Sequence, residues 1–206
     1  LKPPSFTLIA VEEPENSLSP HYLGRIVNAL NSSIGGADSQ AIIATHAPSM
    51  LRRVDPENIR YLRLAANRAT KVTCIALPDK EDEAHKFVRE AVQAFPEVYF
   101  SRLVVLGEGD SEEIVLPRIR QAKGAPVDES AVTIAPLGGR HVNHFWRLLS
   151  ALETPYVTLL DLDVARHQGG WGRVTNVNNQ LAKFAPEKKL PAWNIAKWND
   201  DLPVRT

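Results

Sequence analysis

The sequence predicts an α/β protein. Short apolar runs, such as residues 103–106 and 156–160, are typical of buried strands, and longer amphipathic segments that favour helices separate them. Both runs end directly in acidic residues, which are depleted in strand interiors and costly to bury unpaired. Carboxylates at the ends of core strands are more often metal ligands or catalytic groups than packing residues. The chain is therefore expected to carry its chemistry at strand ends.

Glycine and proline residues mark where the expected elements begin and end. The expected helices cover residues 20–34, 81–94 and 141–152. The other expected strands cover residues 6–11, 41–46, 58–64, 71–75 and 131–137, of which 58–64 and 71–75 form an antiparallel pair. In the helix that follows residue 109, Asp110 is the expected N-cap with Glu113 as its capping-box partner, which leaves Glu112 free for another role.

Four carboxylates follow two of the expected strands. Glu108 and Glu112 lie four residues apart across the turn after residues 103–106, and Asp161 and Asp163 follow residues 156–160. In an extended chain, residues two apart project from the same side. Converging carboxylates suit hard divalent cations, which prefer oxygen ligands. The pattern predicts a metal site, and the alternative interpretation is two acidic turns in an ordinary α/β domain.

The pair Glu108-Gly109 after one strand, followed by Asp161-x-Asp163 after a later strand, resembles the Toprim domain of topoisomerases, primases and related nucleases. The strand over residues 131–137, with its closing Gly-Gly turn, fits the middle of that domain. The resemblance implies an α/β domain with a mainly parallel sheet. It also implies that the acidic residues hold magnesium.

A second signature lies near the N-terminus. The apolar run before Glu12 and Glu13, and a later run that ends at His46, resemble the Walker B strand and switch histidine of ABC-type ATPases, in the variant of SMC-like and RecF-like proteins. The resemblance implies that Glu12 lies on the magnesium side of the nucleotide, Glu13 orients the attacking water and His46 senses the γ-phosphate. Ser17 would belong to the D-loop that touches a partner subunit. Taken singly, these motifs also fit an exposed acidic turn and a loop histidine.

Two other ATPase motifs do not occur in the sequence. There is no Gly-x-x-x-x-Gly-Lys-[Ser/Thr] phosphate-binding loop and no Leu-Ser-Gly-Gly signature. In ABC-type ATPases both lie upstream of Walker B. We therefore expect the chain to be a piece of a longer protein. ATP binding, ATP hydrolysis and a homodimer formed through the ATPase domain are expected only in that full-length protein.

The order of the two signatures is similar to that of the overcoming-lysogenization-defect (OLD) nucleases. The resemblance implies that residues 1–96 are the C-terminal part of an ABC-type ATPase domain and that residues 97–206 are a truncated Toprim nuclease domain. It further implies DNA cleavage with two Mg²⁺ or Mn²⁺ ions. The implied ligands and catalytic residues are Glu108, Glu112, Asp161 and Asp163. The late acidic residue and late lysine of that family have no assigned match.

Composition limits the possible partners. The 24 Lys and Arg residues balance the 24 Asp and Glu residues, so DNA binding requires a local basic patch. After Asp163, seven Lys or Arg residues and three tryptophans accompany only three acids. This segment fits either contact with a DNA backbone or a solvated surface with core tryptophans. The lone Cys74 fits a reducing compartment, and neither a membrane span nor a signal peptide is visible, so a cytoplasmic location is expected.

Three functions fit these motifs. The first is a metal-dependent DNA endonuclease or nickase coupled to an ATPase. The second is another Toprim enzyme, such as a topoisomerase or primase. A topoisomerase needs a nucleophilic tyrosine, which usually lies on a separate domain. The chain's tyrosines all lie in or beside the expected elements, so none is placed for that role: Tyr22, Tyr61, Tyr99 and Tyr156. The third is a DNA-binding clamp or signalling ATPase with a non-cleaving Toprim domain. All four acidic positions are filled, which favours the endonuclease.

Overall fold

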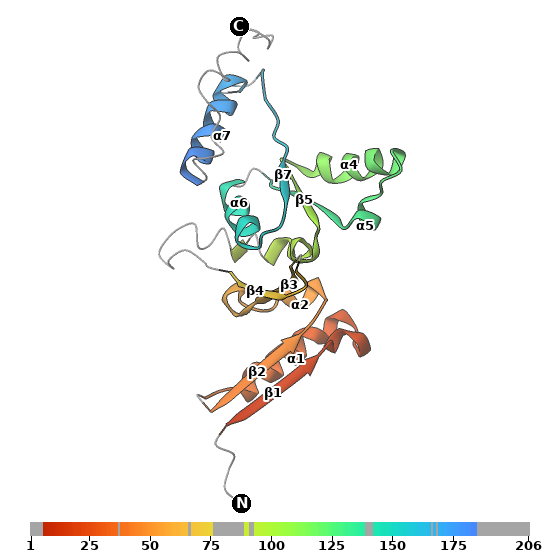
Figure 1. Ribbon diagram of the computed structural model, residues 1–206, viewed down its shortest axis with the longest axis vertical. Helices are drawn as coiled ribbons and strands as arrows, with labels where there is room; N and C mark the ends of the chain where they lie inside the picture. The colour runs from red at the N-terminus through yellow and green to blue at the C-terminus, as the bar shows by residue number, and fades with distance from the viewer. Residues whose placement is uncertain are drawn as a thin grey trace, which may run out of the picture. The chain divides into compact units, whose positions relative to one another are not determined.

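The computed structural model of the chain divides into two compact units (Figure 1). The N-terminal unit comprises Leu1–Ser101 with Ala151–Thr154, and the C-terminal unit comprises Arg102–Ser150 with Pro155–Thr206. The residues that the structure describes are 6–36, 38–65, 67–75, 89–90, 93–138, 142–165, 167 and 169–184. The assignment of residues 1–96 to an ATPase domain and of residues 97–206 to a nuclease domain stays a prediction.

A parallel strand pair with a covering helix begins the N-terminal unit. Strand β1 (Thr7–Glu12) pairs in parallel with β2 (Ser39–Ala44), so that Glu12 lies opposite Ala44 at the end of the pair. Helices α1 (Pro20–Ser33) and α2 (Pro48–Leu51) supply a small core in which Leu23, Val27 and Met50 are buried. The predicted strands and the predicted helix over residues 20–34 are confirmed.

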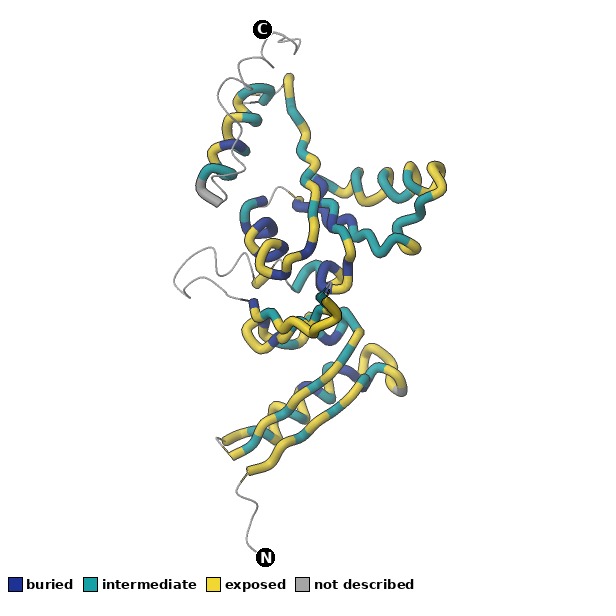
Figure 2. Tube along the Cα trace, in the orientation of Figure 1, coloured by how far each residue is buried: buried dark blue, intermediate teal, exposed yellow. Residues whose placement is uncertain are grey.

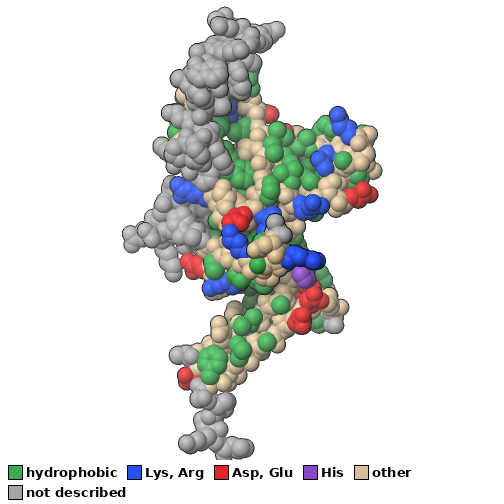
Figure 3. All heavy atoms as spheres, viewed as in Figure 1, with side chains coloured by type: hydrophobic (Ala, Val, Ile, Leu, Met, Phe, Trp, Pro, Cys, Tyr) green, Lys and Arg blue, Asp and Glu red, His purple; other side chains and the backbone are tan. Residues whose placement is uncertain are grey.

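The opposite face of the β1–β2 pair is exposed. Alternate residues of each strand face away from the small core, and among them Leu8 and Ile42 are about half exposed, as is Phe6 just before β1. Figure 3 shows hydrophobic side chains along this strand pair. Parallel strands are usually covered on both faces. Only one face of this pair is covered by the described residues.

The rest of the N-terminal unit contains the predicted antiparallel pair. Strands β3 (Arg60–Leu64) and β4 (Thr70–Cys74) pair with Arg60 opposite Cys74, and Cys74 is exposed. Two 3₁₀ helices flank the pair in sequence, η2 (Pro56–Asn58) and η3 (Pro96–Phe100). Residues 151–154 join this unit through Glu153, which binds Lys71 and Arg63. The predicted helix over residues 81–94 lies mostly outside the described residues.

The C-terminal unit is built on a three-stranded parallel sheet. Its strands are β5 (Leu103–Gly107), β6 (Val132–Pro136) and β7 (Tyr156–Thr158), in the order β6-β5-β7. All pairs are parallel, so the carboxyl ends of the three strands lie at one edge. The predicted strand over residues 156–160 ends at Thr158, although the Leu159 N–H still donates to the Leu106 carbonyl. The predicted α/β fold with a parallel sheet is confirmed.

Helices lie beside this sheet. The longer ones are α4 (Asp110–Ala122), α6 (Val142–Ala151) and α7 (Trp171–Phe184), and α5 (Val127–Ser130) is a single turn. Figure 1 shows α4 and α6 on opposite sides of β5 and β7. Figure 2 shows that α6 is largely buried, whereas no α4 residue is. The Trp146 indole donates to the Thr158 hydroxyl at 2.9 Å and ties α6 to β7.

The buried core of the C-terminal unit lies around β5 and α6. Val104 and Leu106 of the central strand are fully buried, as are Phe145 and Leu149 of α6. Burying one such side chain contributes about 1.5–3 kcal/mol. This core fixes the strand ends from which the acidic residues project. Among the described residues, no helix is long and apolar enough to span a bilayer.

Candidate functional site

Glu108 lies at the centre of the carboxyl edge of the parallel sheet. It directly follows β5, the middle strand, and its carbonyl accepts the Gly138 N–H at 3.0 Å. Its carboxylate Oε2 accepts the main-chain N–H of Asp161 at 2.8 Å and the guanidinium Nη2 of Arg173 at 2.7 Å. The ends of β5 and β7 therefore meet at the Glu108 side chain.

Two glycines allow the chain to approach Glu108 closely. A Cβ on Gly107 would lie 2.6 Å from the Glu112 Cβ, a separation that real Cβ atoms essentially never show. Gly138 has a φ of +58°, in the left-handed region that favours glycine. The missing side chain of Gly107 lets α4 start next to the end of β5. The left-handed backbone of Gly138 forms the turn after β6, whose N–H bonds to the Glu108 carbonyl.

Glu112 has a capping role, so the predicted cap of α4 is wrong. The helix begins at Asp110 with Gly109 as its N-cap, and the Glu112 carboxylate accepts the Gly109 N–H at 2.7 Å and the Ser111 hydroxyl at 3.0 Å. These hydrogen bonds, chiefly that from Gly109, hold the pKa of Glu112 below its ordinary value. Glu113 is exposed instead. The extended backbone of Gly109 moves the cap one residue earlier than Asp110.

Asp161 and Asp163 follow β7 in an irregular segment rather than in a strand. Asp161 is exposed, and its main-chain N–H is held by Glu108. Asp163 is half-buried and has a φ of +51°, a conformation that aspartate adopts more readily than most residues. The Leu162 carbonyl accepts the Gly170 N–H at 2.6 Å, which links this acidic segment to the turn before α7.

The chemistry of these side chains fits a hard divalent cation, because the donors are carboxylate oxygens at converging strand ends. Within the described residues, no three His, Cys, Asp or Glu side chains lie close enough together to hold a metal ion. Glu108 and Glu112 are engaged by protein donors. A metal ion at the oxygens that accept these bonds would compete with the protein donors, and the four-residue ligand set stays a prediction.

Most of the basic segment after Asp163 lies outside the described residues. Arg173, in the first turn of α7, is the basic side chain of that segment whose contact is described, and it reaches Glu108. The sequence analysis counted Arg173 among the seven basic residues after Asp163 and gave it no separate role. The contact joins residues 65 positions apart, so the local sequence contained no signal for it.

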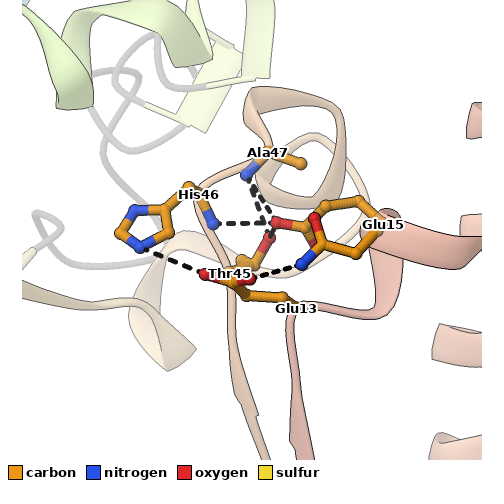
Figure 4. Close-up of polar contacts among 6 residues, drawn as sticks. Glu13, Glu15, Thr45, His46 and Ala47 are labelled. Carbon is orange, nitrogen blue, oxygen red and sulfur yellow. Dashed lines mark hydrogen bonds and ion pairs between the residues drawn. The ribbon is translucent and has the colours of Figure 1, made fainter.

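The predicted switch histidine and its glutamate come together in the N-terminal unit (Figure 4). The Nε2 of His46, which follows β2, lies 3.6 Å from the Oε1 of Glu13, which follows β1. Glu13 also accepts a hydrogen bond from Asn16 and has a φ of +43°. A left-handed backbone conformation at a residue other than glycine costs about 1–3 kcal/mol of stability, and such conformations are common at functional sites. Glu12 is the exposed last residue of β1, and the side chain of Ser17 is outside the described residues.

Glu15, which the sequence did not single out, organises the loop that carries His46. Its Oε1 accepts three hydrogen bonds, from the Thr45 hydroxyl at 2.7 Å and from the main-chain N–H groups of His46 and Ala47 at 2.9 and 3.1 Å (Figure 4). Burial alone would raise the pKa of Glu15, but these hydrogen bonds outweigh it and hold the pKa below 4.5. The carboxylate joins the segment after β1 to the segment after β2.

Replacing Glu15 with Gln is expected to lower the free energy of unfolding by about 1–3 kcal/mol at neutral pH, because three donors lose a charged acceptor. Since the pKa is lowered in the folded state, Glu15 stabilises the fold above pH 4.5, and this stabilisation is lost as the pH falls through the folded-state pKa. Urea titrations at neutral and acidic pH measure the effect. The gap between wild type and variant should narrow in acid, while the exposed Glu57→Gln control should match wild type at both pH values.

Comparison with known proteins identifies the C-terminal sheet. Residues 99–163 match the family described as overcoming lysogenization defect protein-like, TOPRIM domain. This match covers all three strands of the parallel sheet, Glu108, and the segment from Asp161 to Asp163.

Two curated relatives extend the similarity along the chain. The chain is 24% identical over 217 aligned residues to endonuclease GajA of Bacillus cereus (strain HuB5-5), covering 94% of this chain and 31% of that protein. It is 25% identical over 163 residues to endonuclease GajA of Bacillus cereus (strain VD045), covering 79% of this chain and 27% of that protein. The chain thus spans less than a third of the length of these relatives. The family match and the position of the acidic residues agree: residues 99–163 form a Toprim domain like that of the overcoming-lysogenization-defect proteins.

Proposed function

We propose that residues 97–206 are the nuclease part of a metal-dependent DNA endonuclease or nickase. The observation that carries this proposal is the position of Glu108, which lies at the end of the central parallel strand, 2.8 Å from the main chain of Asp161. The two GajA relatives, each described as an endonuclease, support the same reaction class. The substrate is DNA, and the bond cleaved is a phosphodiester.

The residues that would hold Mg²⁺ or Mn²⁺ are the acidic groups at the carboxyl edge of the sheet, namely Glu108, Glu112, Asp161 and Asp163. Ions held there would supply activation of the attacking water and stabilisation of the leaving oxygen. The protein contributes the positions of the carboxylates: the Gly138 N–H fixes the backbone of Glu108, and the Gly107 backbone leaves room for Glu112. As a ligand, Glu112 would bind the metal through an oxygen that now accepts the Gly109 N–H or the Ser111 hydroxyl.

In the full-length protein we propose that this nuclease is coupled to an ABC-type ATPase that forms a homodimer. Support comes from the parallel pairing of β1 and β2, which brings Glu13 within 3.6 Å of His46. In this proposal Glu13 orients water, His46 senses the γ-phosphate, Glu12 lies near magnesium and Ser17 faces the partner subunit. The chain by itself is expected to lack ATPase activity, because it has no phosphate-binding loop.

Two other functions remain as alternatives, a non-cleaving clamp and another Toprim enzyme such as a topoisomerase or primase. The tyrosines argue against a topoisomerase. Tyr99 is buried, and burial raises its pKa. The ring of Tyr61 packs edge-on against Tyr99, and the Tyr156 hydroxyl bonds to Ser150. Tyr22, which is exposed on α1, lies under the guanidinium of Arg25 and far in sequence from the Toprim domain.

Nicking of supercoiled plasmid tests the proposal. The chain is expected to convert supercoiled DNA into open circles with Mg²⁺ or Mn²⁺, and EDTA is expected to stop the reaction. Cleavage should show little sequence preference, because backbone contacts carry no direct sequence information. Open circles that religate would indicate a topoisomerase, and metal-dependent DNA binding without nicking would indicate the clamp.

A further inference from the structure

Arg173 and Glu108 form an ion pair at the carboxyl edge of the Toprim sheet. The Arg173 Nη2 lies 2.7 Å from the Glu108 Oε2, which also accepts the Asp161 N–H at 2.8 Å. A carboxylate oxygen has about two lone-pair directions. Both acceptor positions of this oxygen are therefore in use. Another cation can bind this oxygen only if the Arg173 guanidinium or the Asp161 N–H leaves it.

The fold places Arg173 at this position through the turn that follows the acidic segment. Gly170 has a φ of +59° and donates to the Leu162 carbonyl, and its own carbonyl accepts the Val174 N–H at 3.2 Å, in the first turn of α7. One short loop thus fixes both the acidic segment and the start of the helix. Arg173 reaches Glu108 because of this connection.

The helix end by itself disfavours a cation. Partial positive charge gathers at a helix N-terminus, and the first turn of α7 contains no acidic residue to offset Arg173. The side chains of Arg173 and Glu108 are 35% and 25% exposed, so solvent screens the charge only partly. The Arg173 Nε is buried and has no hydrogen-bond partner among the described residues. Glu108 is the group that balances this charge.

We propose that Arg173 is an internal counter-cation of Glu108 and that a divalent metal ion displaces it. The inference rests on the metal site proposed above. A guanidinium and a divalent ion repel each other when both lie against one carboxylate, so the two cations compete. The affinity of the site for metal then depends partly on the free energy needed to break the ion pair between Arg173 and Glu108. Arg173 is a positioning residue that acts through Glu108.

Calorimetric titration with Mn²⁺ tests this competition. Arg173→Gln is expected to bind Mn²⁺ about threefold to tenfold more tightly than wild type, the range expected when a partly exposed ion pair no longer has to be broken. Arg173→Lys keeps the charge and should bind close to wild type. The matched control is Arg118→Gln, an exposed arginine of α4, which should leave the affinity unchanged.

The outcomes separate the two proposals. If a folded Arg173→Gln protein binds Mn²⁺ as tightly as wild type or more weakly, the proposed competition is wrong, whereas the proposed metal site still stands. Absence of Mn²⁺ binding in wild type overturns both. If Arg173→Gln does not fold, phenylglyoxal labelling of wild type decides: peptide mapping should find Arg173 modified several times faster with Mn²⁺ than with EDTA, and Arg118 modified equally in both. Slower or unchanged labelling of Arg173 overturns the inference.

Discussion

Replacing Glu108 with Gln is expected to lower plasmid nicking by about a hundredfold or more, the loss typical of removing one charge-stabilising group from an active site. The substitution keeps the size of the side chain and removes its negative charge. Glu108 is the acidic residue through which β5, the acidic segment after β7 and Arg173 meet, so no neighbouring carboxylate takes its place. Initial nicking rates at saturating Mg²⁺ measure the effect.

Glu113 offers a matched control for this experiment. It is an exposed glutamate in the first turn of α4, only five residues from Glu108, and Glu113→Gln removes the same charge. The control should nick at the wild-type rate. Equal nicking by wild type and Glu108→Gln would point to a contaminating nuclease or to a different active site. Calorimetry adds a second readout, since Glu108→Gln should also weaken Mn²⁺ binding.

Adding a single methyl group at Gly107 is expected to lower the free energy of unfolding by about 1–3 kcal/mol, the usual cost of overpacking. In Gly107→Ala the new Cβ would lie 2.6 Å from the Glu112 Cβ, so β5 or the start of α4 must shift. The shift weakens the hydrogen bond that Glu112 accepts from Gly109. Urea titration measures the stability.

A double-mutant cycle shows whether this contact is the cause. In a Glu112→Gly background the clashing atoms are absent, so Gly107→Ala should cost less there than in wild type. Gly36→Ala is the control, because a Cβ at Gly36 has no neighbour within 4 Å. The same cost for Gly107→Ala in both backgrounds would show that the destabilisation arises elsewhere.

Local patterns predicted the described strands and the helices α1, α4 and α6, but they did not predict α5 or α7. Apolar runs with sharp Gly or Pro ends gave β1, β2, β5 and β6 nearly at their observed bounds, because burial and turn chemistry act over a few residues. β7 is shorter than predicted, because only Tyr156–Thr158 pairs with β5. The parallel arrangement was implied by family resemblance and not by the runs themselves.

The contacts of the candidate site were harder to predict because they join distant residues. Glu15 binds main-chain groups about thirty residues away, and main-chain donors have no sequence signature. Arg173 pairs with Glu108 across 65 residues of chain, so local spacing contains no sign of it. At α4 the error was one position: Asp110 is a favourable N-cap, but it is equally favourable in the first helical turn, where it lies.

The left-handed backbone of Asp163 has a consequence for how a Toprim domain of this kind can diverge. Asparagine and glycine tolerate a φ of +51°, whereas β-branched residues do not. A single-nucleotide change from Asp to Asn at this position would remove a carboxylate and keep the fold. Lineages that abandon cleavage but retain the domain are therefore expected to carry Asn or Gly at this position. Under the proposed metal site, a survey of natural Toprim sequences for those two residues would separate cleaving from non-cleaving branches without any biochemical assay.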